Sequence, residues 1–209
     1  MDFDRVQEYV ISLVPPRAPV LQEMERVADE TNFPIVGPPS GQLCYLLARA
    51  IGARRVFELG SGYGYSTAWF CRAVKENGGG GVYHVVWSDE LSSKARKYLG
   101  DMGYSDIVQF HVSEAIAALK GTPGPFDLIF NDINKDGYPE SLPVIKQKLR
   151  SGGLLIIDNM LMSGAIFNPD DRSAANEGVR KFTADITQDP DFIVSLVPVR
   201  DGLIVAYRR

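Results

Sequence analysis

The chain has 209 residues, of which 45% are hydrophobic and 23% are charged, and its formal net charge is −4. This length and composition indicate one globular domain with a well-buried core. The small negative charge gives no strong electrostatic case for nucleic acid or an anionic membrane as a partner. No apolar run approaches the roughly 20 residues of a membrane span, and segment 1–5 lacks the apolar core of a signal peptide, so a cytoplasmic protein is expected.

The predicted elements begin with three helices. The first two cover residues 2–13 and 17–31 and are separated by Pro15 and Pro16, which interrupt the helical pattern. The third covers residues 41–51, where apolar side chains recur on one face.

Strand and helix patterns then alternate along the chain. Strands are predicted at 55–59, 82–87, 107–112, 126–131 and 153–158, and helices at 64–76, 90–102, 113–119, 138–149 and 173–187. Two final strands, 192–198 and 203–207, flank a turn at Asp201 and Gly202. The pattern predicts an α/β fold: a doubly wound, mostly parallel seven-stranded sheet with an antiparallel final hairpin and extra N-terminal helices, in the single domain 1–209.

A glycine-rich turn follows the first predicted strand, with Gly60, Gly62 and Gly64 between Val56 and Ser66. Glycines let the backbone turn tightly and approach a ligand closely. The G-x-G-x-G spacing weakens a dinucleotide-binding interpretation, and the absence of Gly-Lys-Ser/Thr excludes a standard P-loop. The carboxylate of Glu58 would repel a phosphate but suits the sulfonium and amine of S-adenosylmethionine, so this methyl donor is favoured. A tight turn without a ligand is the alternative.

Polar side chains follow the fourth and fifth predicted strands, where Asp132, Asp158 and Asn159 stand. Ligands of such sheets bind beyond the carboxyl ends of the strands, so the residues after strands one, four and five are expected to share a crevice. An all-oxygen ligand set suits Mg²⁺, with Mn²⁺ or Ca²⁺ possible, and disfavours zinc. The alternative is that both aspartates only cap the elements that follow.

Lys135 stands three residues after Asp132. A metal ion beside a lysine disfavours its ammonium form and lowers its pKa, so Lys135 is a candidate general base for a hydroxyl acidified by the metal. A solvated surface charge is the alternative.

These motifs, taken in order, resemble those of the cation-dependent class I O-methyltransferases, which contain catechol and caffeoyl-coenzyme A O-methyltransferases and many bacterial relatives. The resemblance covers nearly the whole chain and lies in Leu13–Leu21, Gly41-Gln42, Phe57–Thr67, Asp132-x-x-Lys135-x-x-Tyr138, Gly152–Asn159 and Asp201-Gly202.

The resemblance implies a Rossmann-like fold and assigns roles to the residues that match its motifs. Lys135 is implied as the general base, and Asp132, Asp158 and Asn159 as the metal ligands. Contacts to the cofactor are expected from Glu58, Gly60, Ser61, Gly62, Tyr63, Ser66, Asp89, Glu114, Ala115 and Asp132.

Three segments depart from the family pattern. The acid that binds the cofactor ribose at the end of the second strand is replaced by Val86 or Trp87, and Asp89 is the nearest substitute. Ser113-Glu-Ala115 replaces the usual Gly-Asp-Ala; Glu114 can still accept a hydrogen bond from the adenine amine, and Ser113 can cap the next helix. Asn134 replaces an acid beside Lys135, which leaves less negative charge around the metal site.

The remaining polar and aromatic side chains are given structural roles. His84 and His111 are expected in buried or edge strands, and Trp87 stacks on adenine or packs on the sheet. Cys44 and Cys71, which form no C-x-x-C motif, are expected as buried free thiols. Three arginines near the end of the chain are expected to be solvated: Arg200, Arg208 and Arg209.

The expected function is methyl transfer from S-adenosylmethionine to a metal-bound hydroxyl of a small aromatic, catechol-like acceptor. The apolar loop 160–171 fits a planar substrate, segment 1–52 is expected to contact substrate or a partner subunit, and a homodimer is expected. Rival hypotheses are a tRNA hydroxyuridine O-methyltransferase, a nicotinamide oxidoreductase and a non-catalytic cofactor-binding protein of the same fold.

Overall fold

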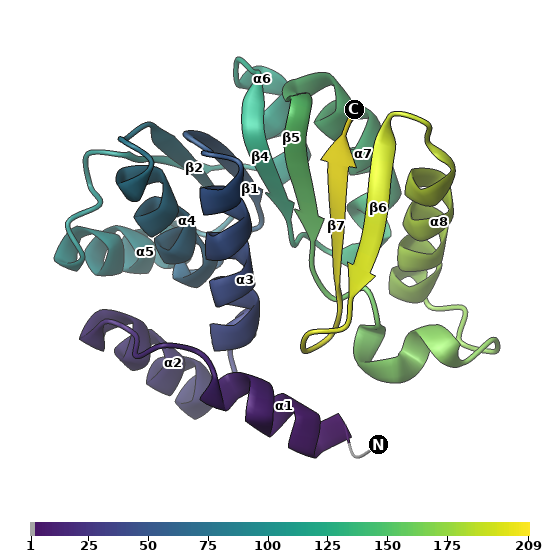
Figure 1. Cartoon of the computed structure of the whole chain (residues 1–209), viewed down its shortest axis with the longest axis horizontal. Coiled ribbons are helices and arrows are strands. Elements are labelled where there is room, and N and C mark those ends of the chain that lie inside the picture. The colour runs from purple at the N-terminus through teal and green to yellow at the C-terminus, as the bar shows by residue number, and fades with distance from the viewer. Residues whose placement is uncertain (1–2) are drawn as a thin grey trace.

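The computed structural model describes residues 3–209, which fold around one seven-stranded sheet with the strand order β3-β2-β1-β4-β5-β7-β6 (Figure 1). The first five strands pair in parallel, and β7 is antiparallel to both of its neighbours. The predicted fold class is therefore confirmed. The strands are β1 Arg55–Leu59, β2 Gly81–Val86, β3 Val108–Val112, β4 Phe126–Asn131, β5 Leu149–Ile157, β6 Phe192–Val197 and β7 Leu203–Arg208.

Eight α-helices are described, and most follow the predicted pattern. The clearest difference is the third, which starts four residues before the predicted position because Pro38 and Pro39 occupy its first turn, where a missing N–H costs nothing. The helices are α1 Phe3–Ser12, α2 Pro19–Thr31, α3 Gly37–Ala50, α4 Tyr65–Glu76, α5 Asp89–Asp101, α6 Ala115–Gly121, α7 Tyr138–Lys148 and α8 Ala174–Gln188. Two 3₁₀ helices, η1 Lys135–Gly137 and η2 Met162–Phe167, were not predicted.

Helices cover both faces of the sheet. Successive strand residues point to opposite sides, so each strand contributes apolar side chains to both faces. Val56, Leu128 and Ile156 pack against α2, α3, α4 and α5, whereas Phe57, Ile129 and Ile157 pack against α6, α7 and α8. The two cysteines are buried and free, as predicted. No helix within residues 3–209 has the length and apolar character to cross a membrane.

The strand order reverses between β1 and β4, and this places the predicted crevice. Leu59 pairs with Asn131, which pairs with Ile157, so three strands end side by side. Asp132 N donates to Leu59 O at 2.9 Å, and Asp158 N donates to Asn131 O at 3.2 Å. The residues that follow β1, β4 and β5 therefore do share one edge of the sheet.

The structure corrects the roles expected for two kinds of side chain. Trp87 does not pack on the sheet, because it lies beyond the end of β2 and is 78% exposed. The terminal arginines are not merely solvated: Arg208 donates to the carbonyls of Lys146 and Leu149, and Arg209 donates to Pro190 O at 2.8 Å. Arg200 donates to Ile35 O at 2.8 Å.

Candidate active site

The glycine-rich turn after β1 is tightly enclosed by other parts of the chain. A Cβ atom on Gly60, whose φ is +83°, would lie 2.5 Å from the carbonyl oxygen of Asp132, so only glycine lets these two segments approach. Ser61 N donates to Val85 O of β2 at 2.9 Å, and Ser61 Oγ accepts from Val85 N at 3.0 Å. Tyr63 donates to Met24 O at 2.9 Å. The turn is thus held against both β2 and α2.

Glu58 stands in β1 below this turn and is fully buried. Neither carboxylate oxygen has a hydrogen-bond partner among the described residues. Burial raises the pKa of Glu58 to about 7, and the nearby hydroxyls of Thr67, Ser66 and Ser61 only partly offset that rise. A buried, unpartnered carboxylate is costly unless a cationic group approaches it, so the structure favours a cation-bearing ligand at this turn.

Asp132 and Lys135 form an ion pair where β4 ends. Lys135 Nζ lies 2.6 Å from Asp132 Oδ1 and 3.2 Å from Ile133 O, and the two side chains are only 18% and 26% exposed for lysine and aspartate. Lys135 is therefore not a solvated surface charge. Burial raises the pKa of Asp132, and the neighbouring ammonium of Lys135 opposes that rise.

Asp158 and Asn159 follow β5 and face the same edge. Asp158 is 4% exposed, and its pKa is raised to about 7, first by burial and then by the negative charge of Asp132. Asn159 has a left-handed backbone, its N donates to Asp158 Oδ1 at 2.8 Å and its Nδ2 donates to Asp201 Oδ2 at 3.1 Å. Tyr138, buried in the helix packing, donates to Asp158 O at 2.9 Å.

These side chains fit a hard cation by their chemistry. The charge of Asp132 disfavours that of the buried Asp158, a divalent ion would neutralise both carboxylates, and the amide oxygen of Asn159 is an acceptable third ligand. Within residues 3–209 no three side chains of His, Cys, Asp or Glu gather as a metal site, so the amide would be required. Lys135 Nζ contacts one of the two Asp132 oxygens, Oδ1.

Asp201 belongs to this site, although the sequence analysis treated it only as part of a turn. Its Oδ1 accepts from Ser163 N at 2.6 Å and its Oδ2 from Asn159. It thereby orients Asn159 from the β6–β7 turn, 42 residues further along the chain. The Asp-Gly dipeptide was the only signal in the sequence, and it indicated a turn rather than a partner for Asn159.

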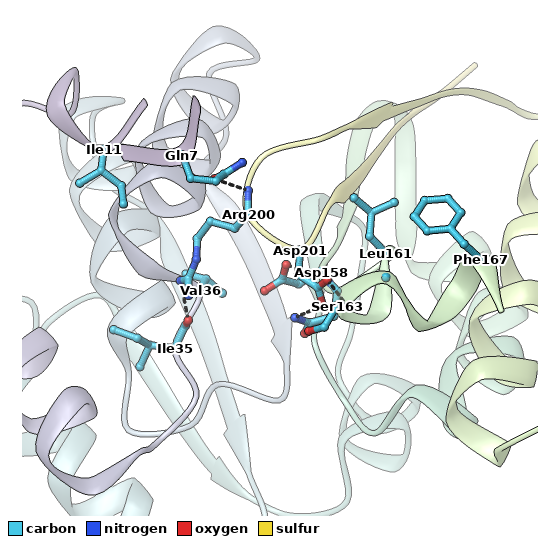
Figure 2. Close-up of a pocket in the computed structure, with 12 residues that line it drawn as sticks. Gln7, Ile11, Ile35, Val36, Asp158, Leu161, Ser163, Phe167, Arg200 and Asp201 are labelled. Atoms are coloured by element: carbon cyan, nitrogen blue, oxygen red, sulfur yellow. Dashed lines mark hydrogen bonds between the residues drawn. The ribbon is translucent and has the colours of Figure 1, made fainter. Parts of the chain in front are cut away.

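A cavity of about 670 Å³ opens beside Asp158 and Asn159 (Figure 2). Its wall includes the β6–β7 turn, η2 and the N-terminal helices, and much of it is apolar. The apolar lining residues are Ile11, Ile35, Val36, Leu161 and Phe167. A second, narrow pocket of about 30 Å³ lies between segment 33–36 and the glycine-rich turn, and it includes Asp132 and Ser66.

The residues expected around the adenine and ribose lie at the ends of β2 and β3. Asp89 is exposed in the first turn of α5, which Ser88 caps. Glu114, rather than Ser113, caps α6: its two oxygens accept from Ile116 N at 2.8 Å and Ala117 N at 2.6 Å. Ala115 begins that helix. Contact of these residues with a cofactor stays a prediction.

Comparison with known proteins agrees with this geometry. A sequence model of the O-methyltransferase family matches residues 13–209. A catechol O-methyltransferase from Niastella koreensis is 29% identical over 98% of this chain and 96% of its own length. Another from Mycobacterium tuberculosis is 31% identical over 75% of this chain and 72% of its own.

Solved structures show the same fold. The O-methyltransferase TomG from Streptomyces achromogenes, involved in tomaymycin synthesis and solved with SAM, superposes with a TM-score of 0.88 at 29% identity, covering 100% of this chain and 99% of that one. An O-methyltransferase from Bacillus cereus in complex with SAH gives 0.88 at 27% identity, covering 98% and 97%.

The chain therefore belongs to the class I S-adenosylmethionine-dependent O-methyltransferases, of the type that includes catechol and caffeoyl-coenzyme A O-methyltransferases.

Proposed function

We propose that the protein methylates one of two neighbouring hydroxyl groups on a small aromatic acceptor, with a divalent cation held by Asp132, Asp158 and Asn159 and with Lys135 as the base. The observation that carries this proposal is the meeting of these four side chains at the ends of β4 and β5, next to the buried carboxylate of Glu58. The largely apolar cavity beside them suits a planar ring.

The proposed binding site for the methionine part of S-adenosylmethionine consists of Glu58 and the glycine-rich turn. The unpartnered carboxylate of Glu58 offers the counter-charge for a cationic ligand, and the narrow pocket beside Ser61, Gly62, Tyr63 and Ser66 adjoins Asp132. S-adenosylmethionine supplies an activated methyl group bound to sulfur. The protein's part is to hold acceptor and donor in line, which removes much of the entropic cost of their meeting.

Magnesium, or manganese or calcium, would supply a Lewis acid that lowers the pKa of an acceptor hydroxyl. Lys135 Nζ donates to Asp132 Oδ1, so the ammonium would stand directly beside a cation held by the same carboxylate. We assign Lys135 Nζ as the group that takes up the proton leaving the acceptor hydroxyl, because it lies 2.6 Å from Asp132 Oδ1 at the proposed cation site. The new O–CH₃ bond then forms as the C–S bond breaks, which leaves S-adenosylhomocysteine.

The test is methyl transfer to catechol with Mg²⁺ and with a chelator, alongside calorimetric titration of S-adenosylmethionine. Chelation is expected to lower turnover at least a hundredfold while cofactor binding persists. Lys135→Met should lower kcat about a hundredfold or more, as expected for loss of a general base, with little change in cofactor affinity. Lys181→Met, which removes an exposed charge from α8, is the matched control.

Each part of the proposal has its own contrary result. Unchanged turnover after chelation would remove the metal from the mechanism. Cofactor binding without methylation of any diol, with or without Mg²⁺, would move the acceptor to another class, such as a hydroxylated base in tRNA, or make the protein a non-catalytic binder.

We further propose that segment 1–52 contributes to substrate binding and to a homodimer. Gln7, Ile11, Ile35 and Val36 line the cavity, which supports the first role. Several apolar side chains of the segment are exposed, which supports the second; among them are Tyr9, Leu13 and Leu46. Sedimentation of the intact protein would show whether it is a dimer.

A further inference from the structure

The cavity beside Asp158 contains one cationic side chain among the described residues that line it, and this is Arg200 (Figure 2). Arg200 stands in the turn between β6 and β7, next to Asp201. Its side chain extends from that turn toward Ile35 and Val36, whereas Asp158 lies to the other side of the turn (Figure 2). The cavity therefore has an anionic and amide-bearing region, apolar walls and a separate cationic point.

The position of Arg200 is fixed by contacts with three segments. Its N donates to Gln7 Oε1 at 3.1 Å and its Nη1 donates to Ile35 O at 2.8 Å. A Cβ atom on Gly37 would lie 1.9 Å from Nη1, so the guanidinium passes over a residue that has no side chain. The backbone of Arg200 is left-handed, with φ of +51°, a conformation that favours glycine or asparagine.

Within the part of the chain whose side chains are described, residues 5–209, the charge of Arg200 is attracted to that of Asp158 without direct contact. No ion pair with Arg200 forms there, and the oxygens of the adjacent Asp201 accept from Asn159 and Ser163 instead. The hydrogen bond to Ile35 uses one of five guanidinium N–H groups. The remaining donors have the planar arrangement that binds a carboxylate or phosphate oxygen pair.

We propose that Arg200 selects acceptors whose aromatic ring carries an anionic group opposite the hydroxyls to be methylated. This inference rests on the proposed function, because it places the hydroxyls near Asp158 and Asn159. The ring then lies between the apolar walls, and the anion meets the guanidinium instead of the carboxylates. A neutral ring of the same shape leaves the Arg200 charge without a partner, and a cationic substituent is repelled.

The experiment compares two acceptors of nearly the same shape, the anionic 3,4-dihydroxybenzoate and the neutral 3,4-dihydroxybenzamide. The wild-type kcat/KM is expected to favour the acid about tenfold, the effect of one charge-assisted hydrogen bond at a partly exposed site. Arg200→Asn, which keeps a residue tolerant of the left-handed backbone, should bring the ratio within about twofold of unity. Arg200→Lys should restore most of the preference, and Arg26→Gln on the exposed surface of α2 should leave it unaltered.

The outcomes separate this inference from the proposed function. Equal use of acid and amide by the wild type overturns the inference and leaves the function standing. If neither of these compounds nor catechol is methylated, the function falls, and calorimetric titration decides the inference: acid binding weakened about tenfold by Arg200→Asn upholds it, and unaltered binding overturns it. The coenzyme A thioester of the acid distinguishes two sources of the anion, because it lacks the carboxylate but carries phosphates. If the wild type prefers the thioester to the acid and Arg200→Asn removes that preference, Arg200 binds a phosphate rather than a carboxylate.

Discussion

The carboxylate of Glu58 is the side chain whose environment most clearly calls for a ligand. It is fully buried, and neither oxygen has a hydrogen-bond partner among the described residues. Burial raises its pKa from 4.5 to about 7. Without a ligand, the folded protein therefore binds this proton more tightly than the unfolded chain does.

The raised pKa of Glu58 predicts how stability depends on pH. Its contribution to the free energy of unfolding is fully present below pH 4.5 and is lost as the pH rises through about 7. Glu58→Gln keeps the shape without the ionisation, so the variant should be more stable than the wild type by about 1–3 kcal/mol at pH 8 and nearly equal at pH 4.5. Urea unfolding at the two pH values measures this difference.

The same substitution should weaken binding of S-adenosylmethionine about tenfold or more, because the ligand's cation loses its counter-charge. Asp158 also has a pKa raised to about 7, but it is present in both proteins, so the difference between them reports Glu58 alone. Equal dependence of stability on pH in the two proteins would show that Glu58 is already ionised and partnered.

At the scale of elements, α2 is attached to the glycine-rich turn and to the start of α4. Glu25 of α2 pairs with Arg17 at 2.7 Å and accepts from Tyr65 Oη at 2.8 Å. Tyr63 donates to a carbonyl of the same helix. The two tyrosines flank Gly64, so the N-terminal segment and the turn are held together.

Removing the shared acceptor tests this attachment. Glu25→Gln keeps the length of the side chain but leaves Arg17 without its ion pair, and it should lower the free energy of unfolding by about 1–2 kcal/mol. Glu23→Gln on the same helix breaks only an exposed ion pair with Arg26 and should have no measurable effect. Urea unfolding of both variants makes the comparison; equal stabilities would mean that the attachment contributes nothing.

The elements that could be predicted from the sequence are those with a strong local pattern. All seven strands were located from their apolar residues and the turn residues that flank them, although β5 begins at Leu149, four residues before the predicted start, because Leu149–Gly152 is not an apolar run. The start of α3 was not, because Pro38 and Pro39 resemble a break in the chain although they suit a first helical turn. Ser113 was a possible cap of α6, but the longer side chain of Glu114 reaches two backbone N–H groups and caps the helix instead.

The candidate site shows the same division between local and long-range information. Asp132 and Asp158 could be picked out because each directly follows a strand, where polar groups emerge from the sheet. Lys135 and Asn159 were found from their spacing, three residues after Asp132 and one after Asp158. Arg200 and Asp201 could not, because their partners lie far away in the sequence: Gln7 and Ile35 for Arg200, and Asn159 for Asp201. No periodicity encodes such contacts.

At the scale of the whole molecule, one sheet separates two apolar clusters. Neighbouring residues of each central strand, such as Val56 and Phe57, belong to opposite clusters. A strand cannot leave the sheet without opening both. The α2–α5 layer and the α6–α8 layer pack on the same sheet, so neither can separate from the other while the sheet stays intact. This supports the proposal that residues 1–209 form one domain.

This architecture predicts that both layers unfold in one cooperative transition. The chain has two tryptophans, and Trp87→Phe leaves only Trp69, which is buried in α4 against Gly41 of α3. Its fluorescence reports the α2–α5 layer, whereas far-ultraviolet circular dichroism reports the helices of both layers. The two urea transitions should coincide, as in two-state unfolding. If the fluorescence transition occurs at a lower urea concentration than the circular dichroism transition, the N-terminal helices unfold first as a separate unit. Segment 1–52 would then be an independently unfolding segment packed on the sheet rather than part of its core.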